Sequence, residues 1–242
     1  MTYNVHGCVG VDRRLEPERI AKAIEAARPD VVALQELYVE HPRSRHLHQA
    51  GWLAERLGMH FEFGAARDVD GGRYGNAVLS RLPLRQLRSA SLPRLSPTLE
   101  QRAALHVAVT TDFGVVDVVN THLGLKPRER ALQTRALVED WLSHVTPESS
   151  SVLCGDLNAV PGSGVYAMFA ELLTDAELSQ RGRRPAKTWP SLFPLVRLDH
   201  VFVAGGLNVV AWRVPRSRLE RFASDHLPIV VDVTPAQKEP VR

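Results

Sequence analysis

The most constraining feature of this sequence is a short apolar run that ends abruptly in polar residues, at positions 151–158. Ser-Val-Leu-Cys is followed by Gly155, Asp156, a leucine and Asn158. A run of apolar and β-branched residues bounded in this way predicts a buried strand. In an extended chain, Asp156 and Asn158 leave the strand tip on the same side. Gly155 removes a side chain where another group must come close.

A simpler interpretation of Asp156 and Asn158 is an Asx turn after the strand, because both residue types are common in turns. The alternative is a chemical role for both residues. The Asp156 carboxylate can take a proton or bind a cation, and the Asn158 amide beside it can donate to an oxyanion. This combination suits hydrolysis of a charged ester. The pattern recurs, since polar residues also follow apolar runs at Asn4, Glu36, Asn120 with His122, Asp199, and Asp225 with His226. Ligand sites in layered α/β proteins gather at strand ends, so the recurrence predicts one shared pocket.

The hydrophobic pattern predicts an α/β chain in which hairpins are mixed with β-α-β segments. Helical periodicity covers residues 15–28, 46–57, 127–144 and 163–173. Strands are expected at residues 1–6, 31–34, 60–64, 76–80, 102–110, 115–120, 151–154, 196–204, 207–214 and 229–233. Strands 102–110 and 115–120 form one predicted hairpin, and strands 196–204 and 207–214 form another. Residues 90–101 and 179–194 are expected to be irregular.

About ten strands are many for a single open sheet, which favours two packed sheets. Helices on the outside then make four layers. No repeat or linker divides the sequence, so we expect one domain over residues 1–242.

Composition excludes several classes of protein. With 44% hydrophobic and 24% charged residues, the chain has an ordinary globular balance. No apolar run approaches the ~20 residues that span a bilayer, and no signal peptide is visible. We expect a soluble monomer without membrane insertion, cytoplasmic if Met1 is the natural start. The net charge of +3 mildly favours an anionic substrate but falls short of a duplex-binding basic patch.

The residue types at the strand ends favour a hard metal ion. The two cysteines, Cys8 and Cys154, make no Cys-based zinc site. Oxygen ligands suit Mg²⁺ or Mn²⁺ better, and Mg²⁺ commonly takes only one or two carboxylates. Glu36 is the best single candidate. Two histidines and further carboxylates then remain for acid–base work and charge stabilisation.

The chain resembles the endonuclease/exonuclease/phosphatase superfamily of metal-dependent phosphoesterases. Each matching piece is weak alone, but the pieces run in the order of that family over nearly the whole chain. They are Thr2-Tyr3-Asn4-Val5, Leu34-Gln35-Glu36, Gly75-Asn76-Ala77-Val78-Leu79-Ser80, Asn120-Thr121-His122, Gly155-Asp156-Leu157-Asn158, Leu198-Asp199-His200 and Ser224-Asp225-His226-Leu227-Pro228.

The resemblance implies a DNase I-like αββα sandwich with two packed mixed sheets and a pocket at one edge of them. It implies that Glu36 and Asn4 belong to the Mg²⁺ site, with Mn²⁺ as a possible substitute. It places Asp225 beside that site, as a ligand or as a residue that supports one.

The resemblance also implies catalytic roles. His226 is the general base and Asp199 orients its ring, which fixes the imidazole tautomer. Asp156 aligns or activates the attacking water, although members of the family differ on whether Asp156 or His226 takes the proton. Asn158 and His122 contact the phosphate and stabilise the developing charge.

Family membership does not choose the substrate. We favour a phosphodiesterase acting on a phospholipid or another small phosphodiester. A nuclease is the first alternative. Residues 179–194 combine basic and aromatic side chains, namely Arg181, Arg183, Arg184 and Lys187 with Trp189 and Phe193. This loop could grip a nucleic-acid backbone and stack a base, it could equally hold a lipid headgroup at a membrane surface, and the simplest interpretation, which we favour, is a solvated loop pinned by a buried tryptophan. A catalytically silent phosphate-binding module is the second alternative. Whether His6, Asn76 and Arg102 belong to the site stays open at this point.

Overall fold

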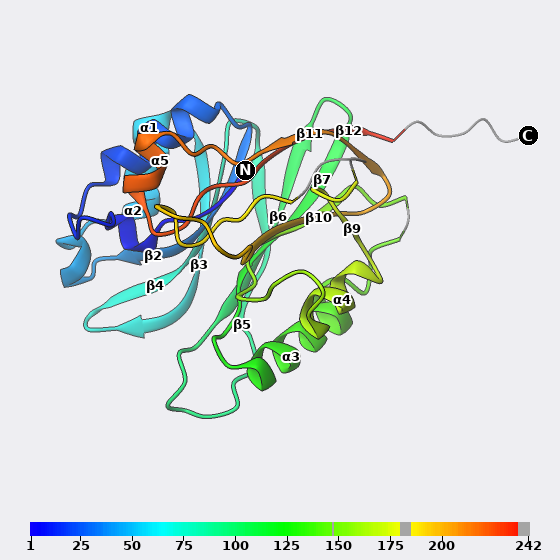
Figure 1. Cartoon of the computed structure of the whole chain (residues 1–242), viewed down its shortest axis with the longest axis horizontal. Helices are drawn as coiled ribbons and strands as arrows, with labels where there is room; N and C mark the ends of the chain where they lie inside the picture. The colour runs from blue at the N-terminus through cyan, green and yellow to red at the C-terminus, as the bar shows by residue number, and fades with distance from the viewer. Residues whose placement is uncertain (147, 180–184, 237–242) are drawn as a thin grey trace, which may run out of the picture.

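Two β-sheets packed face to face form the centre of the protein (Figure 1). The computed structural model describes residues 1–146, 148–179 and 185–236. One sheet contains, in spatial order, β1 (Thr2–Asn4), β2 (Val31–Val39), β4 (Gly72–Ser80) and β3 (His60–Val69). The other contains β5 (Leu84–Ser91), β6 (Ala103–Thr111), β7 (Gly114–His122), β8 (Ser151–Asp156), β10 (Asp199–Val203) and β9 (Thr174–Asp175). A separate pair is formed by β11 (Leu207–Arg213) and β12 (Val230–Pro235).

Both large sheets are mixed, as predicted. Strands β1 and β2 are parallel, and so are β7 and β8, whereas the other pairs are antiparallel. Because parallel neighbours need a crossover, helices lie on the outer faces of the sandwich. The fold is therefore the αββα sandwich that the sequence predicts.

The outer face of the four-stranded sheet is covered by α1 (Pro17–Ala27), α2 (Gln49–Leu57) and the short α5 (Arg218–Ala223) (Figure 1). Helix α1 begins with proline at its first turn, where the missing N–H costs nothing. Its buried positions, including Ile20 and Ile24, fall on one face and pack against the sheet. Two short 3₁₀ turns, η1 (His6–Cys8) and η2 (Pro42–Ser44), follow β1 and β2.

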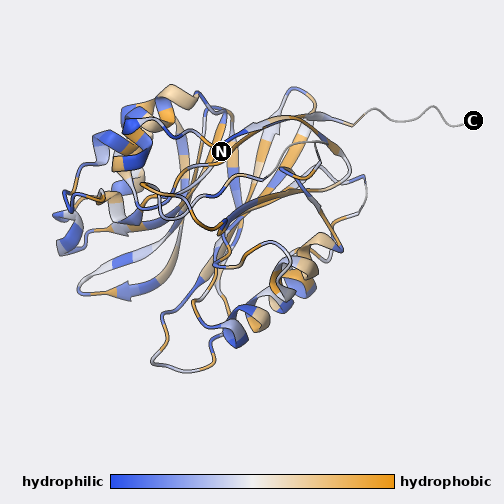
Figure 2. Ribbon diagram, in the orientation of Figure 1, coloured by the Kyte–Doolittle hydropathy of each residue, from blue (hydrophilic) through white to orange (hydrophobic). Residues whose placement is uncertain are grey.

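The outer face of the six-stranded sheet is covered by α3 (Pro127–Ala136) and α4 (Gly164–Ala170). Helix α3 continues into a π-helical turn, η3 (Leu137–Trp141). Trp141 and Phe169 pack from these segments against Leu153 and Phe202 of the sheet. Figure 2 shows hydrophobic residues recurring along the strands that these helices cover. Among the described residues, no helix combines the length and the apolar character needed to cross a bilayer.

Buried amides join the two sheets. Asn120 of β7 donates to the carbonyl oxygens of Leu34 and Ala77 in the opposite sheet, at 2.9 Å each. Gln35 donates back to Asn120 Oδ1 at 2.7 Å. Asn76 likewise donates to the carbonyl of Ala103 at 3.1 Å. Because buried amides need these partners, the bonds fix how the sheets align at the edge that carries the polar strand ends.

Several boundaries differ from expectation. The predicted hairpin of residues 196–204 and 207–214 is wrong, since β10 pairs with β8 and β9 while β11 pairs with β12. The two glycines at 205–206 allow a turn, but they do not dictate which strand lies beside which. The sequence also missed β5, whose residues are mostly polar and exposed, and placed the end of the 127–144 helix too late.

Candidate active site

The polar strand ends surround one pocket of about 700 Å³. The residues that line it include Glu36, His122, Asp156, Asn158, Asp225 and His226. Asn4 and Asp199 lie directly behind this wall, because Asn4 bonds to Glu36 and Asp199 bonds to His226. The structure therefore brings together the polar strand ends predicted to share a pocket, except Asn120, which is buried between the two sheets instead.

Glu36 reaches the pocket through an irregularity in β2. The strand does not end at Glu36, as the sequence suggested, but continues to Val39. Its register against β4 shifts between Leu34 and Leu37, and Glu36 itself has φ of 63°. A bulge of this kind redirects a side chain out of the regular alternation. Strained backbone at a polar residue in a pocket is typical of functional sites.

Asn4 connects the two carboxylates of the pocket wall. Its Nδ2 donates to Glu36 Oε1 at 2.8 Å and to Asp156 Oδ2 at 3.0 Å. Its Oδ1 accepts from the backbone N–H of His6 at 3.1 Å. In this arrangement Asn4 orients Glu36 and Asp156, and its carbonyl oxygen faces the backbone rather than the pocket.

The simpler interpretation of Asp156 and Asn158 as an Asx turn is confirmed. Asp156 Oδ1 accepts from the backbone N–H of Asn158 at 2.9 Å, which is an Asx turn. The same turn holds both side chains at the pocket. Gly155 has φ of 138°, and a Cβ there would lie 1.9 Å from the carbonyl oxygen of Thr121. The expected close approach at Gly155 is thus made by the backbone of β7.

His226 lies between two buried carboxylates. Its Nδ1 is 2.8 Å from Asp199 Oδ2, and its Nε2 is 3.6 Å from Asp156 Oδ2. Burial lowers the pKa of His226, but the charges of Asp199 and Asp156 outweigh it and raise that pKa to about 10. Burial raises the pKa of Asp156 to about 7. Both shifts therefore favour the protonated form of the group concerned.

His122 is held neutral. Burial, then the charges of Arg102 and His226, lower its pKa well below the ordinary value. Arg102 Nη1 lies 3.0 Å from Nδ1, and because arginine only donates, Nδ1 accepts. Nε2 lies 3.1 Å from the amide donor Asn158 Nδ2 and 3.5 Å from Asp156 Oδ2. His122 is thus a neutral ring held in the pocket wall between Arg102 and Asn158.

The sequence left His6, Asn76 and Arg102 undecided, and the structure places His6 and Arg102 at the pocket but not Asn76. Arg102 is 6% exposed, lines the pocket and pairs with Glu100 at 2.7 Å. His6 also lines the pocket, with its Nδ1 3.6 Å from Asp225 Oδ1. Asn76 instead serves the bond between the sheets described above.

The pocket is also lined by residues that the sequence did not assign to the site, namely Tyr38, Arg43, Arg67, Tyr74, Glu100 and Trp189. Arg67 and Tyr74 come from the two strands of one hairpin, and the guanidinium lies 5.5 Å from the ring centre. Of the loop at 179–194, Trp189 lines the pocket and Phe193 is 78% exposed. Arg181, Arg183 and Arg184 lie outside the described residues.

The donor set at the pocket fits a hard divalent cation. Glu36, Asp156 and Asp225 offer carboxylate oxygens there, and none of the lining residues is a cysteine. Such oxygen donors favour Mg²⁺ or Mn²⁺ over a soft metal. Asp156, Asp199 and His226 also lie within 4.8 Å of one another. The 2.8 Å separation of His226 and Asp199 is that of a charge-assisted hydrogen bond.

A four-layer sandwich with carboxylates, histidines and arginine converging at one sheet edge is the architecture expected of the phosphoesterase family that the sequence resembles. Comparison with known proteins agrees, because the model of the Endonuclease/Exonuclease/phosphatase family matches residues 1–226. The chain belongs to this family, whose members are hydrolases acting on phosphate esters and generally use a divalent metal.

Individual relatives span almost the whole chain. The uncharacterized protein YbhP of Escherichia coli K12 is 26% identical over 244 residues, covering 96% of this chain and 94% of that protein. An endonuclease/exonuclease/phosphatase from Beutenbergia cavernae is 28% identical with a TM-score of 0.74, over 97% of this chain and 70% of the other. The Bacteroides thetaiotaomicron mannosyl-6-phosphatase Bt3783 is 18% identical with a TM-score of 0.76, over 96% and 98% of the two chains. That last likeness shows the fold alone.

Proposed function

We propose that this protein is a Mg²⁺-dependent phosphodiesterase that cleaves a phosphate ester by attack of water. The observation that carries the proposal is the amide of Asn4, which holds Glu36 and Asp156 side by side at 2.8 and 3.0 Å. A cation-binding carboxylate and a proton-accepting carboxylate are thereby placed next to each other. This is the arrangement that metal-assisted hydrolysis needs.

Glu36 is the residue that would hold the metal, and Mn²⁺ is expected to substitute for Mg²⁺. Asn4 keeps the Glu36 carboxylate aimed into the pocket. Asp225, whose side chain is 38% exposed at the pocket, is the second candidate ligand. When bound, the divalent ion supplies positive charge for the phosphoryl oxygens.

Asp156 and His226 carry the proton in this proposal. The attacking water must lose a proton, and the two groups lie 3.6 Å apart beside the pocket. His226 is the general base, Asp199 holds its Nδ1–H, and Asp156 aligns the water. Whichever of the two first accepts the proton, the other lies close enough to share it.

Asn158 and His122 contact the phosphate in this proposal. Asn158 Nδ2 is an amide donor beside the His122 ring, and Arg102 adds a buried positive charge behind His122. Preorganised polar groups of this kind stabilise charge that develops on the phosphoryl oxygens.

For the substrate we favour a phospholipid headgroup or another small phosphodiester. The pocket carries Arg43 and Arg67 beside tyrosines, which suits an anionic group and a compact polar body. The alternative is a nuclease, favoured by Trp189, which is 38% exposed at the pocket and can stack a base.

A panel of esters tests both the activity and the substrate. It includes bis-p-nitrophenyl phosphate, p-nitrophenyl phosphate, glycerophospholipids, sphingomyelin, cyclic nucleotides, RNA, and single-stranded and abasic DNA, each with Mg²⁺ and with EDTA. We expect metal-stimulated turnover of diesters, lost in Glu36→Ala and His226→Ala. Steep weakening by salt would favour the nuclease. If no ester is turned over with metal, the protein is a phosphate-binding module instead.

A further inference from the structure

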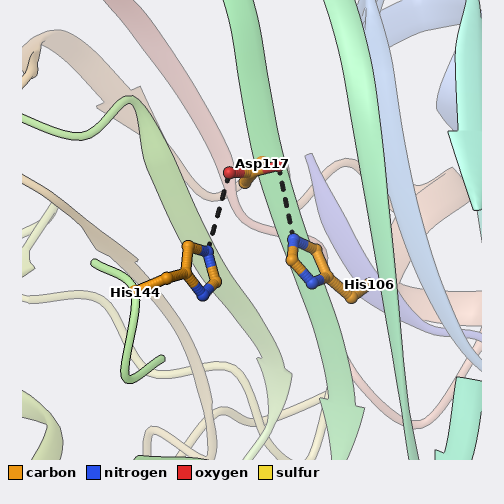
Figure 3. Close-up of side chains that lie close together, drawn as sticks. All are labelled: His106, Asp117 and His144. Atoms are coloured by element: carbon orange, nitrogen blue, oxygen red, sulfur yellow. Dashed lines mark ion pairs between the residues drawn. The ribbon is translucent and has the colours of Figure 1, made fainter. Parts of the chain in front are cut away.

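A second group of potential metal ligands lies away from the pocket, over the outer face of the six-stranded sheet. His106 comes from β6, Asp117 from the neighbouring strand β7, and His144 from the segment after η3 (Figure 3). His106 Nε2 is 3.3 Å from Asp117 Oδ1, and His144 Nε2 is 3.7 Å from Asp117 Oδ2. None of the three lines the catalytic pocket.

The three residues converge because of strand register and chain connection. Asp117 lies diagonally across from His106, which pairs directly with Val119 of β7. Side chains two residues apart share one face of a strand, so His106 and Asp117 point the same way. His144 follows the π-helical turn, which brings it back over this face. Figure 3 shows both imidazole rings directed at the Asp117 carboxylate.

His106 carries an unsatisfied nitrogen into this cluster. The residue is only 7% exposed, and its Nε2 has no hydrogen-bond partner although it lies near Asp117. A buried ring nitrogen without a partner is costly, so such atoms usually have an unseen one. The 3.3 Å contact of this nitrogen with Asp117 Oδ1 is an ion pair outside good hydrogen-bond geometry, so a metal ion would give the nitrogen a direct partner.

The spacing fits a tetrahedral ion. Zinc binds imidazole nitrogen and carboxylate oxygen at about 2.0–2.2 Å, which places neighbouring tetrahedral ligands about 3.3–3.6 Å apart. The imidazole nitrogens lie 3.3 and 3.7 Å from the two different oxygens of Asp117, and one ligand atom from each of the three residues lies within 4.8 Å of the others. His144 is on a half-exposed segment, with its side chain 47% exposed, so its ring can close the remaining gap.

We propose that His106, Asp117 and His144 form a binding site for a zinc-type transition metal ion, separate from the catalytic centre. Two imidazoles and one carboxylate suit Zn²⁺ and disfavour Mg²⁺, which prefers oxygen. Water completes the fourth position. The ion fastens the segment that connects η3 to β8 onto the sheet, and its role is to stabilise that connection.

Zinc binding by the intact protein tests the site. The protein is freed of metal, and Zn²⁺ is titrated against a chromophoric chelator in wild type, His144→Ala, Asp117→Asn and Glu36→Gln. Loss of a residue that merely supports a ligand costs about 10–100-fold in affinity, so loss of a ligand should cost at least 100-fold. We expect one zinc equivalent in wild type and Glu36→Gln, and none at the same concentration in the other two variants.

A matched control uses the pair of His41 and Asp70, whose Nε2–Oδ2 distance is also 3.3 Å. Asp70→Asn breaks a comparable pair in which no third ligand takes part, and it should leave zinc binding unchanged. Thermal unfolding provides a second readout. Zinc should raise the melting temperature of wild type, Asp70→Asn and Glu36→Gln, but not of His144→Ala.

Equal zinc affinity in wild type, His144→Ala and Asp117→Asn would overturn the proposal, as would the absence of zinc binding in wild type at millimolar concentration. If zinc binding disappears only in Glu36→Gln, the ion belongs to the catalytic pocket and the proposed site is wrong. His144 is half exposed, so its replacement should leave the fold intact, which circular dichroism checks.

Discussion

The Nδ1–H of His226 donates to Asp199 Oδ2 at 2.8 Å, and both side chains are almost fully buried. This bond leaves Nε2 as the ring nitrogen that faces the pocket. A general base contributes about 10²–10⁴-fold to a rate. His226→Ala should therefore lower kcat by about that factor.

Asp199→Asn should keep the ring in place but weaken its charge support, giving a smaller loss of kcat with little change in KM. Steady-state kinetics on the best diester substrate measure both variants. His60→Ala, which removes an exposed histidine at the start of β3, is the control and should behave as wild type. Unchanged kcat in His226→Ala would refute the assignment.

Activity should fall as the solution becomes acidic. Burial raises the pKa of Asp156 to about 7, and the neighbouring carboxylates raise that of His226 to about 10 against the opposing effect of burial. Both shifts favour the protonated forms, whereas accepting a proton from water requires a free carboxylate or a neutral ring. Activity is thus retained above the apparent pKa of the Asp156–His226 pair and is lost as the pH falls through that pKa.

The dependence of kcat/KM on pH between pH 5 and 10 measures this loss of activity on the acidic side. A bound divalent ion adds positive charge and lowers the apparent pKa, so a higher metal concentration should move the loss of activity to lower pH. A profile that stays flat toward pH 5 contradicts the proton role of both residues.

Glu36→Gln should remove metal-dependent activity. The substitution keeps the size of the side chain and its bond with Asn4 can persist, but the charge that attracts a cation is gone. A metal at such a centre contributes several kcal/mol, so we expect at least about a 10²-fold loss of turnover. Glu171→Gln changes an exposed carboxylate next to α4 and should keep full activity.

Removal of the metal by a chelator tests the same metal dependence without a mutation. EDTA should abolish turnover in wild type, and added Mg²⁺ or Mn²⁺ should restore it. Turnover that survives prolonged chelation would exclude the metal from the mechanism.

Gly155→Ala should destabilise the protein much more than Gly114→Ala. Both glycines have positive φ, 138° and 123°, so each alanine meets backbone strain of about 1–3 kcal/mol. At Gly155 the new Cβ also meets the Thr121 carbonyl oxygen at 1.9 Å, while at Gly114 it meets nothing within 4 Å. Overpacking adds about 1–3 kcal/mol to the cost at Gly155.

Urea titration of the two variants compares their free energies of unfolding. Equal losses of unfolding free energy in Gly155→Ala and Gly114→Ala would show that the contact between β7 and β8 relaxes without cost. A large loss at Gly155 alone would confirm that the strand tip of Asp156 depends on this close approach.

The sequence determined the class of fold and most of the polar residues that gather at one pocket. Local patterns do this well, because a buried strand needs an apolar run and a turn needs Asp, Asn or Gly. The polar residues that end such runs, from Asn4 to His226, were therefore found without the structure. The Asx turn at Asp156 and the close contact at Gly155 were also visible as local features.

The tertiary structure decided what depends on contacts between distant segments. Which strand lies beside β10 follows from packing across the sheet, so the expected hairpin with β11 failed. Arg102 and His122 meet across β6 and β7, and only that contact shows that the arginine is buried and the histidine neutral. The grouping of His106, Asp117 and His144 likewise depends on register and on the path of the chain after η3, which no run of residues encodes locally.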